Sequence, residues 1–300
     1  MKHRLQDGEV QLLQNIAFSL VEEVDIFYAQ RAAGFIREGS NDEIRMEIEE
    51  VKERMIRSVE VLENMRQGTE SYTRALHTLY VLCMGKYASA DEGVSSVAER
   101  RQKACETLNG ITSIGFLCHN LSAKLAQLPL AVASGADEAM GLQVTLEQEI
   151  RMLLNVLINM VLSVRDDEQL VRDFLDPANG IEEMCFRSIK FSLEIAVVPI
   201  RKFLIIFYVF LRLLFGPTSP TKKEWKDLKF NKELLLLLVE KGESPRFHLK
   251  GAETDAVELF YKRHMSSDNP IPQIIVVGIL RVLLTTCPNA ARNSGKTLFK

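Results

Sequence analysis

Three hundred residues are enough for one large domain or two smaller ones, and 47% hydrophobic with 26% charged residues is typical of a globular protein. The net charge of −3 excludes a strong overall attraction to nucleic acid or to an anionic membrane. The start of the chain lacks the apolar core of a signal peptide, and the cysteines are odd in number and scattered. We therefore expect a reducing, cytoplasmic location without a disulfide framework. The cysteines are Cys83, Cys105, Cys118, Cys185 and Cys287.

Helical periodicity dominates the first half of the chain, and its clearest example begins at Ser40. Residues 40–43 read Ser-Asn-Asp-Glu, a capping box in which the serine and Glu43 each satisfy an N–H of the first turn. Apolar residues then recur every three or four positions, while charged residues fill the other face. The pattern predicts an amphipathic helix from Ser40 to a stop near Gly68. Its apolar positions are Ile44, Ile48, Val51, Met55, Val59 and Leu62.

Similar patterns predict further helices along the chain, and no segment alternates in the manner of a strand. Residues 97–128 are expected to form one or two helices, with Gly110 and Gly115 as weak points, and residues 176–180 form a turn. The total of about ten to twelve helices predicts an all-α protein, an irregular α-solenoid of the armadillo or HEAT kind without a clean sequence period. The other expected helices span residues 10–30, 72–84, 146–164, 182–197, 234–239, 252–265 and 272–286.

An apolar segment near residue 200 divides the predicted organisation. Its uninterrupted run, residues 203–211, is much shorter than the roughly 20 residues of a bilayer-spanning helix, and Arg201, Lys202 and Arg212 flank it. We expect a buried helix over residues 200–215, within an N-terminal helical region of residues 1–216. Alternatively, this helix inserts into a membrane surface. A basic loop (217–231), a C-terminal helical part of the same domain (232–288) and a polar tail (289–300) are expected to follow.

The chain shows no spacing that marks a metal or catalytic site. Cys118 and His119 are adjacent, so on a helix their side chains point about 100° apart, and a core cysteine beside a boundary histidine is expected. Residues 293–297, Asn-Ser-Gly-Lys-Thr, match only the end of a phosphate-binding loop and are expected to be a polar tail. The acidic residues 166–168 are expected to cap a helix start. We therefore predict no catalytic, cofactor-binding or metal-binding residue.

The segment from Val197 to Lys232 is strongly basic, with eight basic and two acidic residues, a balance of +6. One interpretation is contact with an anionic partner, such as a phosphorylated ligand, a lipid headgroup or an acidic protein surface. The other is a solvated loop whose lysines maintain solubility. The candidate contact residues are Lys222, Lys223, Lys226 and Lys229.

Two parts of the C-terminal half resemble the striatin-interacting protein family, called Far-eleven in yeasts. Residues 198–204, Val-Pro-Ile-Arg-Lys-Phe-Leu, lead into the apolar helix as a similar segment does in that family. Residues 259–265, Leu-Phe-Tyr-Lys-Arg-His-Met, are followed by Pro-Ile-Pro-Gln (270–273) and by a leucine-rich helix that ends at Cys287-Pro288. Ile271 replaces the leucine of the family's Leu-Pro-Gln turn, and the resemblance covers about 90 residues.

The resemblance implies a non-enzymatic scaffold subunit of a striatin-interacting phosphatase and kinase complex. The implied partners are a striatin-type regulatory subunit, the scaffold and catalytic subunits of protein phosphatase 2A, and germinal-centre-type kinases. The implied processes are signalling, cell morphology and the cytoskeleton. Family members are usually much longer than this chain. The alternatives are a peripheral membrane-associated helical protein and an enzyme of unrecognised type; nucleic acid is not an expected partner.

Overall fold

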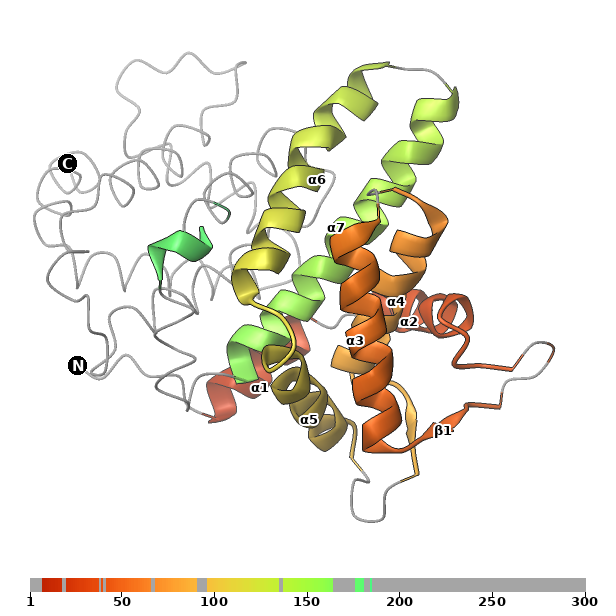
Figure 1. Cartoon of the computed structure of the whole chain (residues 1–300), viewed down its shortest axis with the longest axis vertical. Helices are drawn as coiled ribbons and strands as arrows, with labels where there is room; N and C mark the ends of the chain where they lie inside the picture. The colour runs from red at the N-terminus through yellow and green to blue at the C-terminus, as the bar shows by residue number, and fades with distance from the viewer. Residues whose placement is uncertain are drawn as a thin grey trace, which may run out of the picture. The chain divides into compact units, whose positions relative to one another are not determined.

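Seven α-helices account for most of the residues that the computed structural model describes (Figure 1). The described residues are 7–17, 20–37, 39, 42–65, 68–90, 96–134, 137–163, 176–180 and 184, and all lie in one unit, Gln6–Met184. The prediction of a mostly helical protein is confirmed for these residues. The helices are α1 (Asp7–Ala17), α2 (Leu20–Ala32), α3 (Ile48–Asn64), α4 (Glu70–Cys83), α5 (Val97–Asn109), α6 (Ile114–Ser134) and α7 (Asp137–Ser163).

The core forms around α4 and α7. Helix α4 contacts α2, α3, α5 and α7, and α7 also contacts α1, α5 and α6. Both helices are apolar around most of their circumference, which requires cover from neighbours on several sides. Every residue from Met152 to Leu162 is buried, as are Tyr72, Leu76 and the run from Thr78 to Cys83. The other helices therefore pack around these two, and α6 runs alongside α7 (Figure 1).

Helix α3 has the amphipathic character that its sequence predicts, but the predicted start is wrong. Val51, Met55, Val59 and Leu62 are buried against α4, whereas the helix begins at Ile48 with Glu47 as an N-cap that makes no side-chain capping bond.

The segment before α3 is extended because it pairs with residues outside the helix predicted from Ser40. Glu43 forms an antiparallel bridge with Ile36, and its carboxylate accepts a hydrogen bond from Gln30 Nε2 at 3.0 Å. These tertiary contacts use Glu43, so it does not close a capping box; Ser40 and Asn41 lie outside the described residues. Tertiary pairing has prevailed over the local capping pattern.

Two very short strands form a parallel pair that the sequence does not predict. Strand β1 (Arg45–Met46) pairs with β2 (Ala88–Ser89), with Arg45 opposite Ala88 and Met46 opposite Ser89. Met46 is buried, and its carbonyl accepts a hydrogen bond from Ala90 N at 2.9 Å. Two residues are too few for an alternation of apolar and polar side chains to be recognised.

Capping residues close in sequence set the starts of α4 and α5 and the end of α5. The Thr69 hydroxyl accepts a hydrogen bond from the Tyr72 N–H at the start of α4. Ser96 and Glu99 form a reciprocal capping box at the start of α5, and Gly110 is its C-cap, so the weak point predicted there is confirmed. The predicted helix 72–84 matches α4, whereas the single helix predicted over residues 10–30 corresponds to two helices, α1 and α2, which extend beyond that range at both ends.

Two glycines permit close contacts between segments. Gly85 has a φ of +66°, and a Cβ there would meet Val97 O and, at 2.8 Å, Arg101 N. Gly115, the other predicted weak point, lies inside α6, where a Cβ would meet the side chain of Asn179. Asn179 ends the 3₁₀ helix η1 (Pro177–Asn179), which with Gly180 at φ +64° confirms the predicted turn at 176–180.

The predicted apolar helix 200–215, the basic loop 217–231, the C-terminal part 232–288 and the tail 289–300 lie outside the described residues, as does the acidic segment 166–168. Among the helices that are described, none has the length and apolarity needed to cross a membrane.

Candidate functional site

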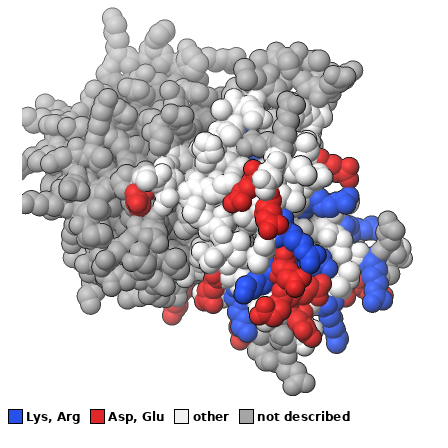
Figure 2. Space-filling model, viewed as in Figure 1, with Lys and Arg blue, Asp and Glu red and all other residues white. Residues whose placement is uncertain are grey.

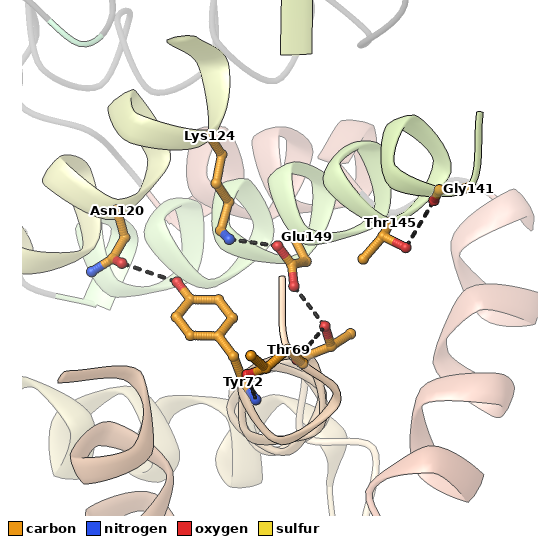
Figure 3. Close-up of polar contacts among 8 residues, drawn as sticks. Thr69, Tyr72, Asn120, Lys124, Gly141, Thr145 and Glu149 are labelled. Carbon is orange, nitrogen blue, oxygen red and sulfur yellow. Dashed lines mark hydrogen bonds and ion pairs between the residues drawn. The ribbon is translucent and has the colours of Figure 1, made fainter. Parts of the chain in front are cut away.

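A fully buried ion pair lies where α4, α6 and α7 meet (Figure 3). Lys124 Nζ on α6 is 2.5 Å from Glu149 Oε2 on α7, and neither side chain has any exposed surface. The other carboxylate oxygen, Glu149 Oε1, accepts a hydrogen bond from the Thr73 hydroxyl on α4 at 2.6 Å. A buried charge is tolerated when it is paired and its remaining hydrogen-bonding capacity is used. Glu149 meets both conditions and connects three helices.

Tyr72 extends this polar cluster on α4. The Lys124 ammonium lies 4.2 Å from the centroid of the Tyr72 ring, a cation–π contact. The Tyr72 hydroxyl donates to Asn120 Oδ1 at 2.9 Å (Figure 3). Asn120 Nδ2 in turn donates to the Phe116 carbonyl at 3.0 Å. The polar groups of this cluster are therefore satisfied within the protein.

The environment shifts the acid–base properties of three side chains around Glu149. Burial lowers the pKa of Lys124, and the nearby Glu149 carboxylate opposes this shift. Burial raises the pKa of the Tyr72 hydroxyl, and the charge on Glu149 adds to the rise. Burial also lowers the pKa of His77, one turn beyond Thr73 on α4, with Glu149 again acting in the opposite direction. The Glu149 charge thus acts on residues of both α4 and α6.

This cluster has a structural role, because Lys124 and Glu149 are sealed from solvent and no substrate can reach them. Neither Lys124 nor Glu149 was identified from the sequence, although the sequence contains a signal for both. Both charges lie on the apolar stripe of their helix: Lys124 among Leu121, Leu125 and Leu128, and Glu149 among Leu146, Ile150 and Leu153. A charge in the apolar stripe of a helix indicates that it needs a buried partner of opposite charge.

A small cavity of about 110 Å³ adjoins this cluster between α2, α4 and α7. His77 and Arg151 line it together with Asp25 and Tyr28. The His77 Nδ1 and Arg151 Nε atoms are buried and make no hydrogen bond within the protein. Charged side chains therefore border this space, and two residues of its lining have a buried nitrogen atom without a hydrogen bond in the protein.

A second, larger cavity of about 370 Å³ lies between α1, α5 and α7. Asn159 lines it, and its Nδ2 donates to the Cys83 carbonyl at 3.1 Å while its Oδ1 makes no hydrogen bond. Arg101 and Cys105 also border this space. The volume falls within the range of small-molecule sites.

The three described cysteines are free and buried. Burial raises the pKa of the Cys118 thiol to about 12, and side-chain hydrogen bonding with Cys105, followed by burial, raises the pKa of Cys83. The Cys83 and Cys118 thiols are therefore protonated at neutral pH and are poor nucleophiles. Cys118 is buried whereas His119 is exposed, as expected for a core cysteine beside a boundary histidine.

The candidate partner contacts Lys222, Lys223, Lys226 and Lys229 lie outside the described residues, so the structure does not bring them to any site. The same holds for residues 293–297. Within the described ranges, no group of three or more His, Cys, Asp or Glu side chains is arranged to hold a metal ion.

A comparison of the chain with known protein families, curated proteins and solved structures finds no match.

Proposed function

We propose that this protein is a non-enzymatic helical scaffold of a striatin-interacting phosphatase and kinase complex, acting in the cytoplasm. In this role the helices form an irregular α-solenoid of the armadillo or HEAT kind. Its partners are a striatin-type regulatory subunit, the scaffold and catalytic subunits of protein phosphatase 2A, and germinal-centre-type kinases. The observation that carries it is the resemblance of residues 198–204 and 259–288 to the striatin-interacting family.

The described helices support a role in protein contacts. Helix α3 is fixed to the core by Val51, Met55 and Leu62, so its outer face has a defined position. That face is densely charged, and Figure 2 shows basic and acidic side chains interleaved over this part of the surface. Charged surfaces on rigid elements give specificity and fast association to protein complexes. The exposed charged residues of α3 are Glu49, Lys52, Glu53, Arg57, Glu60 and Glu63.

The experiment is affinity purification of the tagged full chain from its native cells, read by mass spectrometry and by phosphatase activity on the beads. The expected result is co-purification of a striatin-type subunit with the protein phosphatase 2A scaffold and catalytic subunits. Recovery of none of these subunits under low-salt conditions would refute the proposal.

Charge variants then test which surface is used. Reversal of Lys222, Lys223, Lys226 and Lys229 to Glu is expected to reduce recovery of the complex if the basic segment contacts an acidic partner surface. Reversal of Arg74 on α4 and Lys103 on α5, two exposed basic residues outside α3, is the surface control. Flotation with anionic vesicles separates the scaffold from a peripheral membrane protein, since only the latter is expected to float with lipid.

A further inference from the structure

Helix α2 exposes three apolar side chains on one face. Its main contact is with α4, and it lies at the edge of the described helices (Figure 1). Ile26 and Ala29 are buried, whereas Val24, Phe27 and Tyr28 are 56%, 37% and 65% exposed. The exposed residues are three and four positions apart, so they lie side by side along the helix. A contiguous apolar patch that contains two aromatic rings is typical of an interaction surface.

Opposite charges lie at the two ends of this patch. Glu23 and Arg31 are both exposed, and each is four residues away from Phe27. The Arg31 guanidinium lies 5.8 Å from the centroid of the Phe27 ring, which is itself 5.9 Å from the centroid of the Tyr28 ring. The charged ends and the apolar centre therefore form one surface. We call this surface the α2 stripe; it consists of Glu23, Val24, Phe27, Tyr28 and Arg31.

The α2 stripe is complementary to itself, because its opposite charges are equally far from its centre. In an antiparallel pair of α2 helices related by a twofold axis at Phe27, Glu23 of each copy lies beside Arg31 of the other. Four residues span about 6 Å along a helix and packed helices are about 8–10 Å apart, so these side chains can meet. Lys86 Nζ binds Glu23 Oε1 within the chain at 3.0 Å, and a carboxylate can accept several hydrogen bonds at once.

We infer that the α2 stripe is a docking surface for a second copy of this chain, in an antiparallel, twofold-symmetric contact centred on Phe27. Val24, Phe27 and Tyr28 of the two copies form the apolar centre. Two contacts between Glu23 and Arg31 flank it, one on each side. A partner with charge of one sign is attracted at one end of the stripe and repelled at the other, whereas a second copy is attracted at both. The inference concerns self-association and is independent of the scaffold role proposed above.

The first test is sedimentation equilibrium of the full-length protein over a concentration series. A monomer–dimer equilibrium is expected with a dissociation constant on the order of 10–100 μM, because a contact built on one helix is smaller than the standard interface of about 1,200 Å² or more. A protein that remains monomeric up to about 200 μM would overturn the inference.

Loss of the apolar centre should weaken the dimer. Val24→Ser with Tyr28→Ser removes two exposed apolar side chains from the stripe and should raise the dissociation constant at least about tenfold. Leu142→Ser with Val144→Ser is the matched control, because it removes side chains of α7 that are 46% and 51% exposed; this variant should dimerise like the unaltered protein. Equal dimerisation of the Val24 and Tyr28 variant and the control would overturn the inference.

Charge reversals test the antiparallel arrangement. Glu23→Arg places Arg against Arg at both ends of the contact, and Arg31→Glu places Glu against Glu, so each variant should dimerise about tenfold more weakly. An equimolar mixture of the two variants should form a heterodimer, because every end contact then joins an Arg to a Glu. The swapped variant, with both changes in one chain, should dimerise like the unaltered protein for the same reason.

The mixture and the swapped variant keep the test valid if one reversal alone perturbs the protein. Circular dichroism establishes that each variant is folded, and the Glu23 side chain is 64% exposed, so its ion pair with Lys86 contributes little to stability. Glu53→Arg, the same change at an exposed residue of α3, is the matched control and should leave dimerisation unchanged. A mixture that associates no more strongly than either reversal variant alone would overturn the inference.

Discussion

Ion pairs with similar distances occupy two different environments in this protein. On α3, Arg57 Nη2 lies 2.8 Å from Glu53 Oε2, and both side chains are mostly exposed, at 73% and 64%. Between α6 and α7, Lys124 and Glu149 are 2.5 Å apart with no exposure at all. Water screens the first pair, so it contributes little to stability. Each charge of the second pair depends on its partner, because solvent cannot replace it.

The comparison shows that distance alone does not indicate the energetic importance of an ion pair. The α3 pair adds solubility and a few tenths of a kcal/mol to its own helix. The buried pair determines which faces of α6 and α7 meet, because any other register leaves a charge unpaired in the core. Thr73 and Tyr72 extend this requirement to α4.

Loss of Glu149 should have the largest effect. Glu149→Leu leaves Lys124 buried without its counter-charge, and we expect the free energy of unfolding to fall by about 3–5 kcal/mol. The measurement is hydrogen exchange of the α7 amides together with urea denaturation. A loss below about 1 kcal/mol would contradict the asymmetry between the two regions.

A double variant provides the control for this prediction. In Lys124→Met with Glu149→Leu, apolar side chains replace both charges, so most of the lost stability should return. A double variant as unstable as the single one would show that the cost comes from packing and not from an unpaired charge.

Removal of the Tyr72 hydroxyl should have an intermediate effect. Tyr72→Phe takes away the donor to Asn120 Oδ1 at a buried position, and we expect a loss of about 1–2 kcal/mol in the free energy of unfolding. Tyr28→Phe removes the same hydroxyl from an exposed residue of α2 and should cost less than about 0.5 kcal/mol. Equal effects in thermal denaturation would remove the distinction between the buried and exposed regions.

His77 should give the buried region a pH dependence. Burial lowers its folded-state pKa from the ordinary value of 6.5, so below about pH 6.5 the unfolded chain binds more protons than the folded one. The free energy of unfolding should therefore decrease as the pH falls from 6.5 toward the lowered pKa. The charged groups near His77 are Glu149, Arg151 and Asp25.

The measurement is urea denaturation between pH 5 and pH 8 for the unaltered protein and for His77→Gln. The variant should lose this part of the slope, whereas His119→Gln, which changes an exposed residue and retains His77, should keep it. Identical profiles for the unaltered protein and His77→Gln would contradict the prediction.

The smallest effect is expected on α3. A double-mutant cycle on Glu53 and Arg57 should give a coupling energy of about 0.3–0.5 kcal/mol, and the coupling should decrease in high salt. A coupling above about 2 kcal/mol would show that the exposed pair behaves like the buried one.

Most of the helices within residues 7–163 could be predicted from the sequence, because their signals are local. The three- and four-residue spacing of Val51, Met55, Val59 and Leu62 marks the buried face of α3, and Gly110, predicted as a weak point, is the C-cap of α5. The start of α3 could not be predicted. Its capping pattern at Ser40 is local, whereas the contact that replaces it joins Glu43 to Ile36 and Gln30.

The buried ion pair was partly predictable from the sequence. The sequence shows a charge on the apolar stripe of each helix, but only the packing of α6 against α7 shows that the two charges meet. The cavity beside it could not be predicted, because His77, Arg151 and Asp25 come from three helices and share no sequence spacing. The candidate lysines at 222–229 remain a prediction.

Helix α7 is the last long helix of the described unit, and it covers apolar surface on α1, α4, α5 and α6. During synthesis on the ribosome, these earlier helices emerge before the segment that covers them. Their apolar faces stay open to aggregation until residues 137–163 have been translated. A truncated product that ends before Asp137 should therefore depend on chaperones and be degraded quickly, even though it contains six of the seven described α-helices.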